Sequence, residues 1–400
     1  MPASSTDSAD PPGDKHTRFT TWAQARGVAI QGVQAQHLPG RGHGLITTQP
    51  IRAGDRILFI PPKAMFHADP ALRRAHPSLR DASPHAHLAL SALQAFPSAP
   101  PPPPDVDAAG LALWRSTWPS PAAFARCMPL HWPARALACV PPAVRAPLER
   151  QRADYARDWQ VARPVCEARG WGEAEFAYVW MLVNSRSFYW KAPRAAGGGM
   201  VLCPFVDYMN HVPSEGGCGM VKTDRGYEVV ADRAYDVGEE ILATYGAHSN
   251  DKLLVHYGFV VPHVPDGHSA DDDIRLDHLL LPRLSEQTRA QLADVGYLGG
   301  YSLLPAANEL CFKTQVAVRA ELLTCNEWEF FVGMGEDMTV DHTGEVERFV
   351  RGILSEYRDE AVEWIRESRK LEIEVQRNLL VLRWQQIVDA IDRFCKPPCS

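Results

Sequence analysis

The spacing of apolar and polar residues divides this chain into a β-rich part followed by a helical part. Between residues 33 and 62, short apolar segments with many β-branched residues are separated by glycines and by the turn "RAGD", a pattern typical of strands and hairpins. The same character returns in "GMVLCPFVDYMNH", "YEVVADRAYDVGEEILATYG" and "LLVHYGFVV". Beyond residue 273, apolar residues recur three and four positions apart with charges on the other faces, which predicts amphipathic helices.

A helical but interrupted stretch, which contains the proline run "APPPPPD", separates the β-rich part into two halves. We therefore predict an α+β fold in which a helical insertion splits one β-rich domain and an all-α domain follows it. The expected segments are a disordered tail (1–17), the N-terminal β-rich half (18–66), the helical insertion (67–170), the C-terminal β-rich half (171–261), a linker (262–273) and the all-α domain (274–400).

Composition limits the classes of protein to which the chain can belong. The formal net charge of -7 provides no overall basic field, so broad binding to nucleic acid or to anionic membranes is not expected. No apolar stretch reaches the roughly 20 residues of a spanning helix, and the N-terminal residues lack the apolar core of a secretory signal. We expect a soluble, monomeric protein of the cytoplasm or nucleus.

The nine cysteines show no regular spacing, which favours reduced thiols over a disulfide framework. Only the terminal "CKPPC" resembles a pair of metal ligands, and it has no second pair near it, so a zinc site there is not favoured.

Three polar clusters occur where the apolar segments of the β-rich part end: "GRGHGLI", "VNSRSFYWK", and "DYMNH" together with "ATYGAHSNDKLLVHYGF". The glycines of the first cluster allow the backbone to approach a ligand closely, although glycine-rich turns are commonly structural. They do not fit the dinucleotide-binding pattern G-x-G-x-x-G, because the last glycine is replaced by Leu45.

Asn210 and His211 follow a segment that should be buried. Both side chains can donate and accept hydrogen bonds, so they could fix the orientation of a polar ligand. An Asx-type turn that caps the strand is the structural alternative. A metal site that uses Asp207 and His211, as in a hydrolase, is least favoured because His211 has no partner at the spacing of a helical zinc site.

Aromatic residues flank the same clusters. Tyr245 ends the apolar segment "EILATY" before Gly246, which would place its hydroxyl at the rim of a pocket, although a strand-terminal tyrosine can be only a rim residue. Many aromatic rings beside few polar groups predict a narrow apolar channel for one long side chain. The flanking rings are those of Phe188, Tyr189, Trp190, Tyr257 and Phe259.

In their order along the chain, "GRGHGLITTQPIRAGDRILFIP", "NSRSF", "LCPFVDYMNH" and "YDVGEEILATYGAHSNDKLLVHYGFV" resemble the SET-domain protein methyltransferases. The closer likeness is to the branch typified by the Rubisco large-subunit lysine methyltransferase, which has a split SET domain and a helical substrate-binding domain. The detailed match covers residues 40–62 and 185–261. The resemblance implies an S-adenosylmethionine-dependent protein-lysine N-methyltransferase that acts on a non-histone or ribosomal-type protein.

The resemblance also implies roles for individual residues, with Tyr245 as the catalytic one. The positions that match cofactor-binding residues are Arg41, Gly42, His43, Ser185, Arg186, Asn210, His211 and Phe259. Those that match substrate-binding residues are Phe188, Trp190, Asp207 and Tyr257. Two positions depart from the family pattern: Val212 replaces a frequent serine, and Trp190 replaces a basic residue of the plant enzyme. The second departure makes the plant enzyme's substrate a poor guide.

Two other functions stay open at this point. The same branch includes a protein-histidine N-methyltransferase, whose neutral imidazole substrate would need hydrogen-bonding partners more than a lowered pKa. A catalytically silent SET-like module would bind a partner through the helical domain. The intact set of Arg186, Asn210, His211 and Tyr245 argues against that second alternative.

Overall fold

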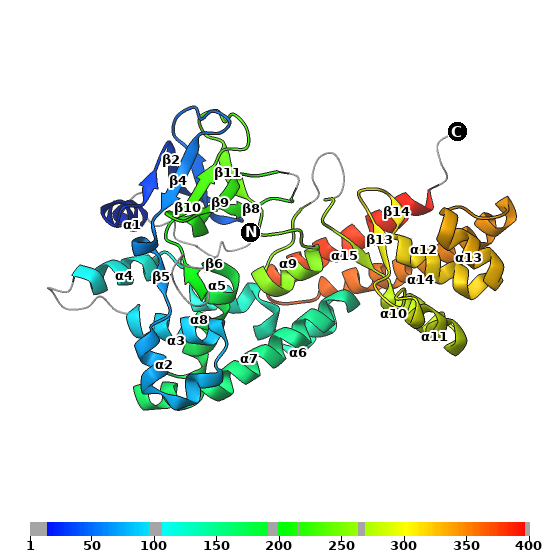
Figure 1. The fold of residues 1–400 in the computed structure, drawn as a ribbon, viewed down its shortest axis with the longest axis horizontal. Helices are drawn as coiled ribbons and strands as arrows, with labels where there is room; N and C mark the ends of the chain where they lie inside the picture. Colours follow the sequence, from blue (N-terminus) through cyan, green and yellow to red (C-terminus); the bar gives the residue numbers. More distant parts are fainter. Residues whose placement is uncertain (1–13, 97–105, 191–198, 215, 263–268, 397–400) are drawn as a thin grey trace. The chain divides into compact units, whose positions relative to one another are not determined.

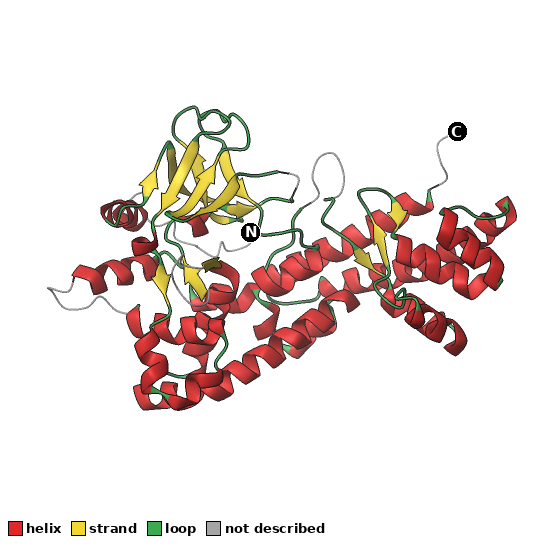
Figure 2. Cartoon of the chain, viewed as in Figure 1, coloured by secondary structure: helices red, strands yellow, loops and turns green. Residues whose placement is uncertain are grey.

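The computed structural model of the protein describes residues 14–96, 106–190, 199–214, 216–262 and 269–396 (Figure 1). The chain forms two compact units. The first combines Met1–Phe124 with Gln151–Gly246, and the second combines Ala125–Arg150 with Ala247–Ser400. Figure 2 shows that most strands belong to the first unit, whereas the second unit is mainly helical.

The first unit contains three small sheets, and each combines strands from both predicted β-rich halves. Their strand orders are β1-β4-β10-β9, β2-β3-β11-β8 and β5-β7-β6. The strands are β1 (Ala29–Ile30), β2 (Val33–Leu38), β3 (Gly42–Thr47), β4 (Arg56–Ile60), β5 (Phe66–His67), β6 (Ser187–Trp190), β7 (Gly199–Leu202), β8 (Asn210–His211), β9 (Gly219–Thr223), β10 (Gly226–Val230) and β11 (Glu240–Ala243). The predicted split of one β-rich domain by an insertion is therefore confirmed.

One strand pair differs from the others in the first unit. β8 runs parallel to β11, with Asn210 opposite Leu242 and His211 opposite Ala243. All other pairings between these strands are antiparallel. The parallel pair places the Asn-His step beside the strand that leads to Tyr245.

The helices of the first unit pack around these sheets. Phe19 on α1 is fully buried, and its ring lies 6.0 Å from that of Trp114 on α4. α3 packs on α8, which is apolar along its buried residues and carries Arg186 at its last position. The helices are α1 (Asp14–Ala25), α2 (Pro70–Ala75), α3 (Pro84–Ala95), α4 (Val106–Ser116) and α8 (Glu173–Arg186), with α5 (Pro121–Cys127) and α7 (Pro142–Arg169) extending into both units.

Three predicted segments lie partly or wholly outside the described residues. α1 begins within the predicted tail of 1–17, whose residues 1–13 are not described. The proline run at 99–105 and residues 263–268 of the predicted linker are also outside the described residues.

The second unit is helical, as predicted, but it also contains a small sheet that the prediction excluded. Its helices are α6 (Ala134–Ala138), α9 (Asn250–Tyr257), α10 (Asp277–Leu280), α11 (Glu286–Asp294), α12 (Phe312–Leu322), α13 (Cys325–Met334), α14 (Val340–Ser368) and α15 (Glu374–Cys395). The sheet has the order β12 (Ile274–Arg275), β13 (Ser302–Leu304) and β14 (Glu309–Leu310). Strands of two or three residues are too short to produce a detectable alternation.

The boundary between the units also differs from the predicted domain limits. Residues 125–150 and 247–261 pack with the C-terminal helices instead of with the insertion and the C-terminal β-rich half. The reason is a shared apolar core: Trp132, Val144 and Leu148 cluster with Leu254 of α9 and Leu380 of α15. Burial of these side chains together decides the grouping, which adjacency in the sequence does not reveal.

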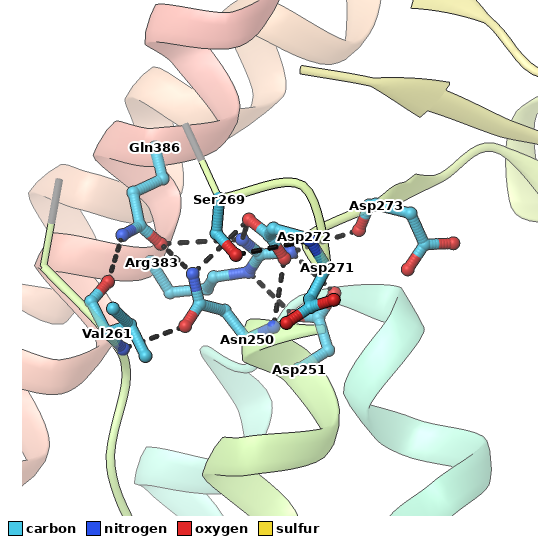
Figure 3. Close-up of polar contacts among 9 residues, drawn as sticks. All are labelled: Asn250, Asp251, Val261, Ser269, Asp271, Asp272, Asp273, Arg383 and Gln386. Carbon is cyan, nitrogen blue, oxygen red and sulfur yellow. Dashed lines mark hydrogen bonds and ion pairs between the residues drawn. The ribbon is translucent and has the colours of Figure 1, made fainter. Parts of the chain in front are cut away.

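A buried ion-pair network fixes α9 and the segment 269–273 to α15 (Figure 3). Arg383 is fully buried, and its guanidinium lies 2.7 Å from the carboxylates of both Asp251 and Asp272. Asn250 donates to Asp272 and to Gln386. Burial opposes the charge of Arg383, but the two carboxylates outweigh this effect and raise its pKa. The buried cation is therefore compensated, and each of the two carboxylates has a cationic partner.

Arg383→Met should destabilise the protein by about 3–5 kcal/mol, because it leaves two carboxylates buried without their cation. Urea unfolding followed by circular dichroism measures the loss. Arg366→Met is the matched control: this arginine pairs with Glu363 on the exposed face of α14, and such pairs contribute at most about 1 kcal/mol. Equal unfolding midpoints for the two variants would contradict the importance of the network.

Candidate functional site

The turn between β2 and β3 presents the first predicted cofactor-binding residues. Gly40 and Gly42 adopt φ angles of +75° and +77°, a region that strongly favours glycine. Arg41 lies between them, and its backbone N–H donates to the Leu38 carbonyl at 3.0 Å. The turn therefore exposes the Arg41 side chain and leads directly to His43 on β3.

The side chain of Asn210 is fixed by two acceptors. Its Nδ2 donates to Glu240 Oε1 at 2.8 Å and to the His43 carbonyl at 3.3 Å. Both amide protons are thereby used, and among the described residues no donor is bonded to its Oδ1. Asn210 is therefore oriented so that it offers a hydrogen-bond acceptor to a ligand.

Glu240 is a residue of this site that the sequence analysis missed. Its Oε2 lies 2.7 Å from Arg41 Nη1, while its Oε1 holds Asn210. A Cβ atom on Gly44 would come within 2.8 Å of Glu240 Oε1 and 3.1 Å of Asn210 Nδ2, so this glycine allows the two side chains to meet. The sequence offered no signal, since Glu240 stands in "DVGEE", which reads only as a turn followed by a strand.

His211 and Tyr245 are joined directly. The backbone N–H of Tyr245 donates to His211 Nδ1 at 3.1 Å, and the two rings lie 5.1 Å apart. The Tyr245 hydroxyl donates to the Met209 carbonyl at 2.7 Å. The structure thus brings the predicted catalytic phenol and the Asn-His step to one place in the first unit.

The loop after His211 is hydrogen-bonded to the end of β11. The N–H groups of Val212 and Cys218 donate to the carbonyls of Ala243 and Leu242, at 3.1 and 2.8 Å. Val212 and Cys218 therefore both hydrogen-bond to the end of β11, just before Tyr245. The Val212 side chain lies beside Gly217, where a Cβ atom would come within 2.5 Å of Val212 Cγ1.

Arg186 and Asp207 form a second polar pair next to the Asn-His step. Arg186 Nη1 donates to the Asp207 carbonyl at 2.8 Å and lies 3.8 Å from the carboxylate. Burial raises the pKa of Asp207, and Arg186 opposes that shift. Phe205, fully buried with a φ of +74°, precedes the short helix that carries Asp207. Such backbone strain in a bulky residue is concentrated at functional sites.

Three further predicted residues lie in the same unit without a direct bond to the Asn-His step. Ser185 donates to the Met181 and Leu182 carbonyls of its own helix. Phe188 and Trp190 both pack near Tyr227, with ring separations of 5.9 and 5.4 Å. Trp190 is only 3% exposed, and its contact with a substrate stays a prediction.

Tyr257 and Phe259 belong to the second unit, at the end of α9. Gly258 between them has a φ of +75° and caps the helix, and the two aromatic rings lie 6.2 Å apart. Burial raises the pKa of Tyr257. The structure brings this pair of rings together, and their role beside the residues of the first unit stays a prediction.

The part of the chain that the structure describes shows neither a group of metal ligands nor a helix that could span a membrane. The described residues contain no group of three or more His, Cys, Asp or Glu side chains that could hold a metal ion. The terminal "CKPPC" is only partly described, because Cys399 lies outside. No described helix is long and apolar enough to cross a membrane.

The family model for the SET domain matches residues 42–246, just over half of the chain. The chain belongs to the SET-domain family. The match begins at Gly42, the first residue of β3, and ends directly after Tyr245, so it covers Asn210, His211, Glu240 and Tyr245 and the insertion.

The chain is similar to curated proteins that carry this SET domain. It is 28% identical over 185 residues to the ribosomal lysine N-methyltransferase set11 of Schizosaccharomyces pombe, covering 46% of this chain and 44% of that one. It is 30% identical over 210 residues to the ribosomal lysine N-methyltransferase 2 of Saccharomyces cerevisiae, covering 45% and 37%. The chain therefore spans less than half the length of these two relatives. SET domain-containing protein 4 of Mus musculus is 24% identical over 328 residues, covering 74% and 72%.

Solved structures with the same fold extend over nearly the whole chain. The SET domain of LSMT bound to lysine and AdoHcy has a TM-score of 0.58 at 16% identity, covering 94% of this chain and 91% of that one. Rubisco LSMT bound to AdoMet has a TM-score of 0.58 at 14% identity, covering 95% and 92%. At these identities the likeness concerns the fold, and it includes both the split SET domain and the helical region.

Proposed function

We propose that this SET-domain protein is an S-adenosylmethionine-dependent protein-lysine N-methyltransferase that acts on a non-histone protein of ribosomal type. The observation that carries the proposal is the junction of Tyr245 with the Asn210–His211 step. Two relatives named as ribosomal lysine N-methyltransferases support the acceptor residue and the substrate class.

The residues at the β2–β3 turn fit the chemistry of this cofactor. S-adenosylmethionine carries an ammonium and a carboxylate on its amino-acid portion, and its sulfonium supplies the methyl group. Asn210 Oδ1 is an acceptor suited to the ammonium, and the half-exposed Arg41 guanidinium is suited to the carboxylate. The Gly40–Gly42 turn adds backbone groups that a ligand can approach closely.

The acceptor amine must lose its proton before it can attack a methyl group. A free lysine has a pKa of about 10.4 and is almost wholly protonated at pH 7. A channel lined by rings such as that of Phe188 would desolvate the amine, and the neighbouring sulfonium charge would repel its proton. Both effects lower the amine pKa, so no separate general base is required.

The hydrogen bond of Tyr245 determines how its hydroxyl can act. Because its one proton is donated to the Met209 carbonyl, the phenol oxygen can act toward the substrate only as an acceptor. It can receive an N–H of the amine and make weak C–H···O contacts with the transferring methyl group. Orientation of the amine in the channel supplies a further share of the rate through proximity.

The function itself is tested by incubating the full chain with methyl-labelled S-adenosylmethionine and purified ribosomal proteins. Mass spectrometry should find the label on a lysine side chain. Label on a histidine would establish the histidine N-methyltransferase alternative instead. Cofactor binding without any labelled product in ribosomal proteins or in whole-cell extract would support the catalytically silent module.

Tyr245→Phe should lower kcat by roughly 10²-fold, because the acceptor that orients the amine and methyl group is lost. The Kd for S-adenosylmethionine, measured by calorimetry, should change by less than about twofold, since the cofactor is held by other residues. Tyr297→Phe, in the second unit, removes a hydroxyl that has no role in this site. Unchanged kcat in Tyr245→Phe would refute the assigned role.

Glu240→Ala should weaken S-adenosylmethionine binding about tenfold, because the Asn210 amide loses the acceptor that orients it. Glu240→Gln keeps an acceptor and should restore most of the affinity. The matched control is Glu239→Ala, because the native Glu239 carboxylate pairs with Arg233 and not with Asn210. If the alanine variants at 239 and 240 bind equally well in calorimetry, Glu240 does not position Asn210.

We also propose that the protein works as a monomer in the cytoplasm or nucleus, without binding nucleic acid or membrane. The net charge of -7 supports the absence of nucleic-acid and membrane binding. The nine irregularly spaced cysteines support a reducing compartment.

A further inference from the structure

One end of the second unit exposes a cluster of apolar side chains. Phe330, Met334, Met338 and Val340 are 37%, 68%, 48% and 86% exposed. Eleven large apolar residues are exposed in the described parts of the chain, and these four fall within residues 330–340. Such concentration differs from the scattered exposure that is normal for a protein surface.

The cluster is built on a fixed backbone. Phe330 and Met334 lie four residues apart on α13 and therefore share one face, while Phe331 is buried on another. Gly335 ends the helix with a φ of +78°. We call this region, from Phe330 to Val340, the α13-end surface.

The turn of the α13-end surface is fixed by hydrogen bonds to the Asp337 carboxylate. The Asp337 carboxylate accepts from Arg319 Nε and Nη2 at 2.6 and 2.7 Å, and Arg319 is buried. The Thr343 hydroxyl donates to the same carboxylate at 3.0 Å. Two-point binding of a buried arginine holds the turn in one conformation, so Met338 and Val340 are exposed from an ordered support.

Acidic residues alternate with the apolar residues along the same stretch of chain. Residues 325–347 contain seven Asp or Glu residues and neither Lys nor Arg. Two of the seven, Glu327 and Asp337, are used in caps and internal bonds. The other five are exposed: Glu329, Glu336, Asp341, Glu345 and Glu347. Glu347 is paired with Arg351, so the acidic rim consists of Glu329, Glu336, Asp341 and Glu345, and it creates a local negative field that attracts cations.

We propose that the α13-end surface docks a partner protein through a basic amphipathic helix, with apolar residues on one face and Lys or Arg beside them. Exposed methionine and phenylalanine side chains adapt to an apolar helix face, and the acidic rim complements its basic flanks. The same rim repels nucleic acid, anionic lipid and a second copy of this surface. The proposal goes beyond methyl transfer and does not depend on it.

The test uses the full chain and a fluorescent peptide of leucine and lysine, about 18 residues long, with the leucines on one helical face. Fluorescence anisotropy should detect binding that weakens as salt rises. Glu336→Lys with Glu345→Lys should raise the Kd at least about tenfold. The control pair, Glu149→Lys with Glu309→Lys, changes the net charge equally and should leave the Kd within about twofold.

The apolar contribution is tested separately. Met334→Ser with Val340→Ser should also raise the peptide Kd about tenfold, whereas Val237→Ser, at an exposed site in the first unit, should not. Circular dichroism checks that the variants are folded. Equal weakening by the control charge pair, or unchanged binding in the Met334 variant, would overturn the proposal. A dimer detected by light scattering and dissolved by Met334→Ser would overturn it in favour of self-association.

Discussion

The candidate site depends on the short parallel pairing between β8 and β11. With Asn210 opposite Leu242 and His211 opposite Ala243, the strand β11 can serve both members of the step. Glu240 at its beginning binds the Asn210 amide, and Tyr245 just beyond its end binds His211 through its backbone N–H. A slip of one residue would turn each of these side chains to the opposite face of the sheet.

Asn210 and Tyr245 each offer an acceptor, and not a donor, to a ligand. The Asn210 amide protons are used by Glu240 and His43, and the Tyr245 proton is used by Met209. Such acceptors match a cationic ligand rich in N–H and polarised C–H groups. The ammonium and the sulfonium methyl of S-adenosylmethionine are groups of this kind. The bonds exist before any ligand arrives, so little reorganisation is needed.

The sequence predicted the fold to the extent that residue patterns are periodic. Alternation in the β-rich segments and three- and four-residue spacing in the helices predicted the split domain and the helical C-terminal region. Patterns could not reveal the two-residue strand at Asn210, the position of Glu240 beside it, or the grouping of 125–150 with the C-terminal helices, because each depends on contacts between distant segments. His211 and Tyr245 stood out because each lies at the end of an apolar run, and the resemblance to the SET-domain family implied their roles, but their mutual bond was not predictable.

A crystal structure of the full chain with S-adenosylhomocysteine and a lysine-containing peptide would show directly whether Asn210 binds the cofactor and Tyr245 binds the acceptor amine. In that structure, the ligand's ammonium should lie within hydrogen-bonding distance of Asn210 Oδ1, and the peptide amine should point at the Tyr245 oxygen and the ligand sulfur. A ligand bound away from Asn210, or an amine that cannot reach the phenol, would contradict these roles.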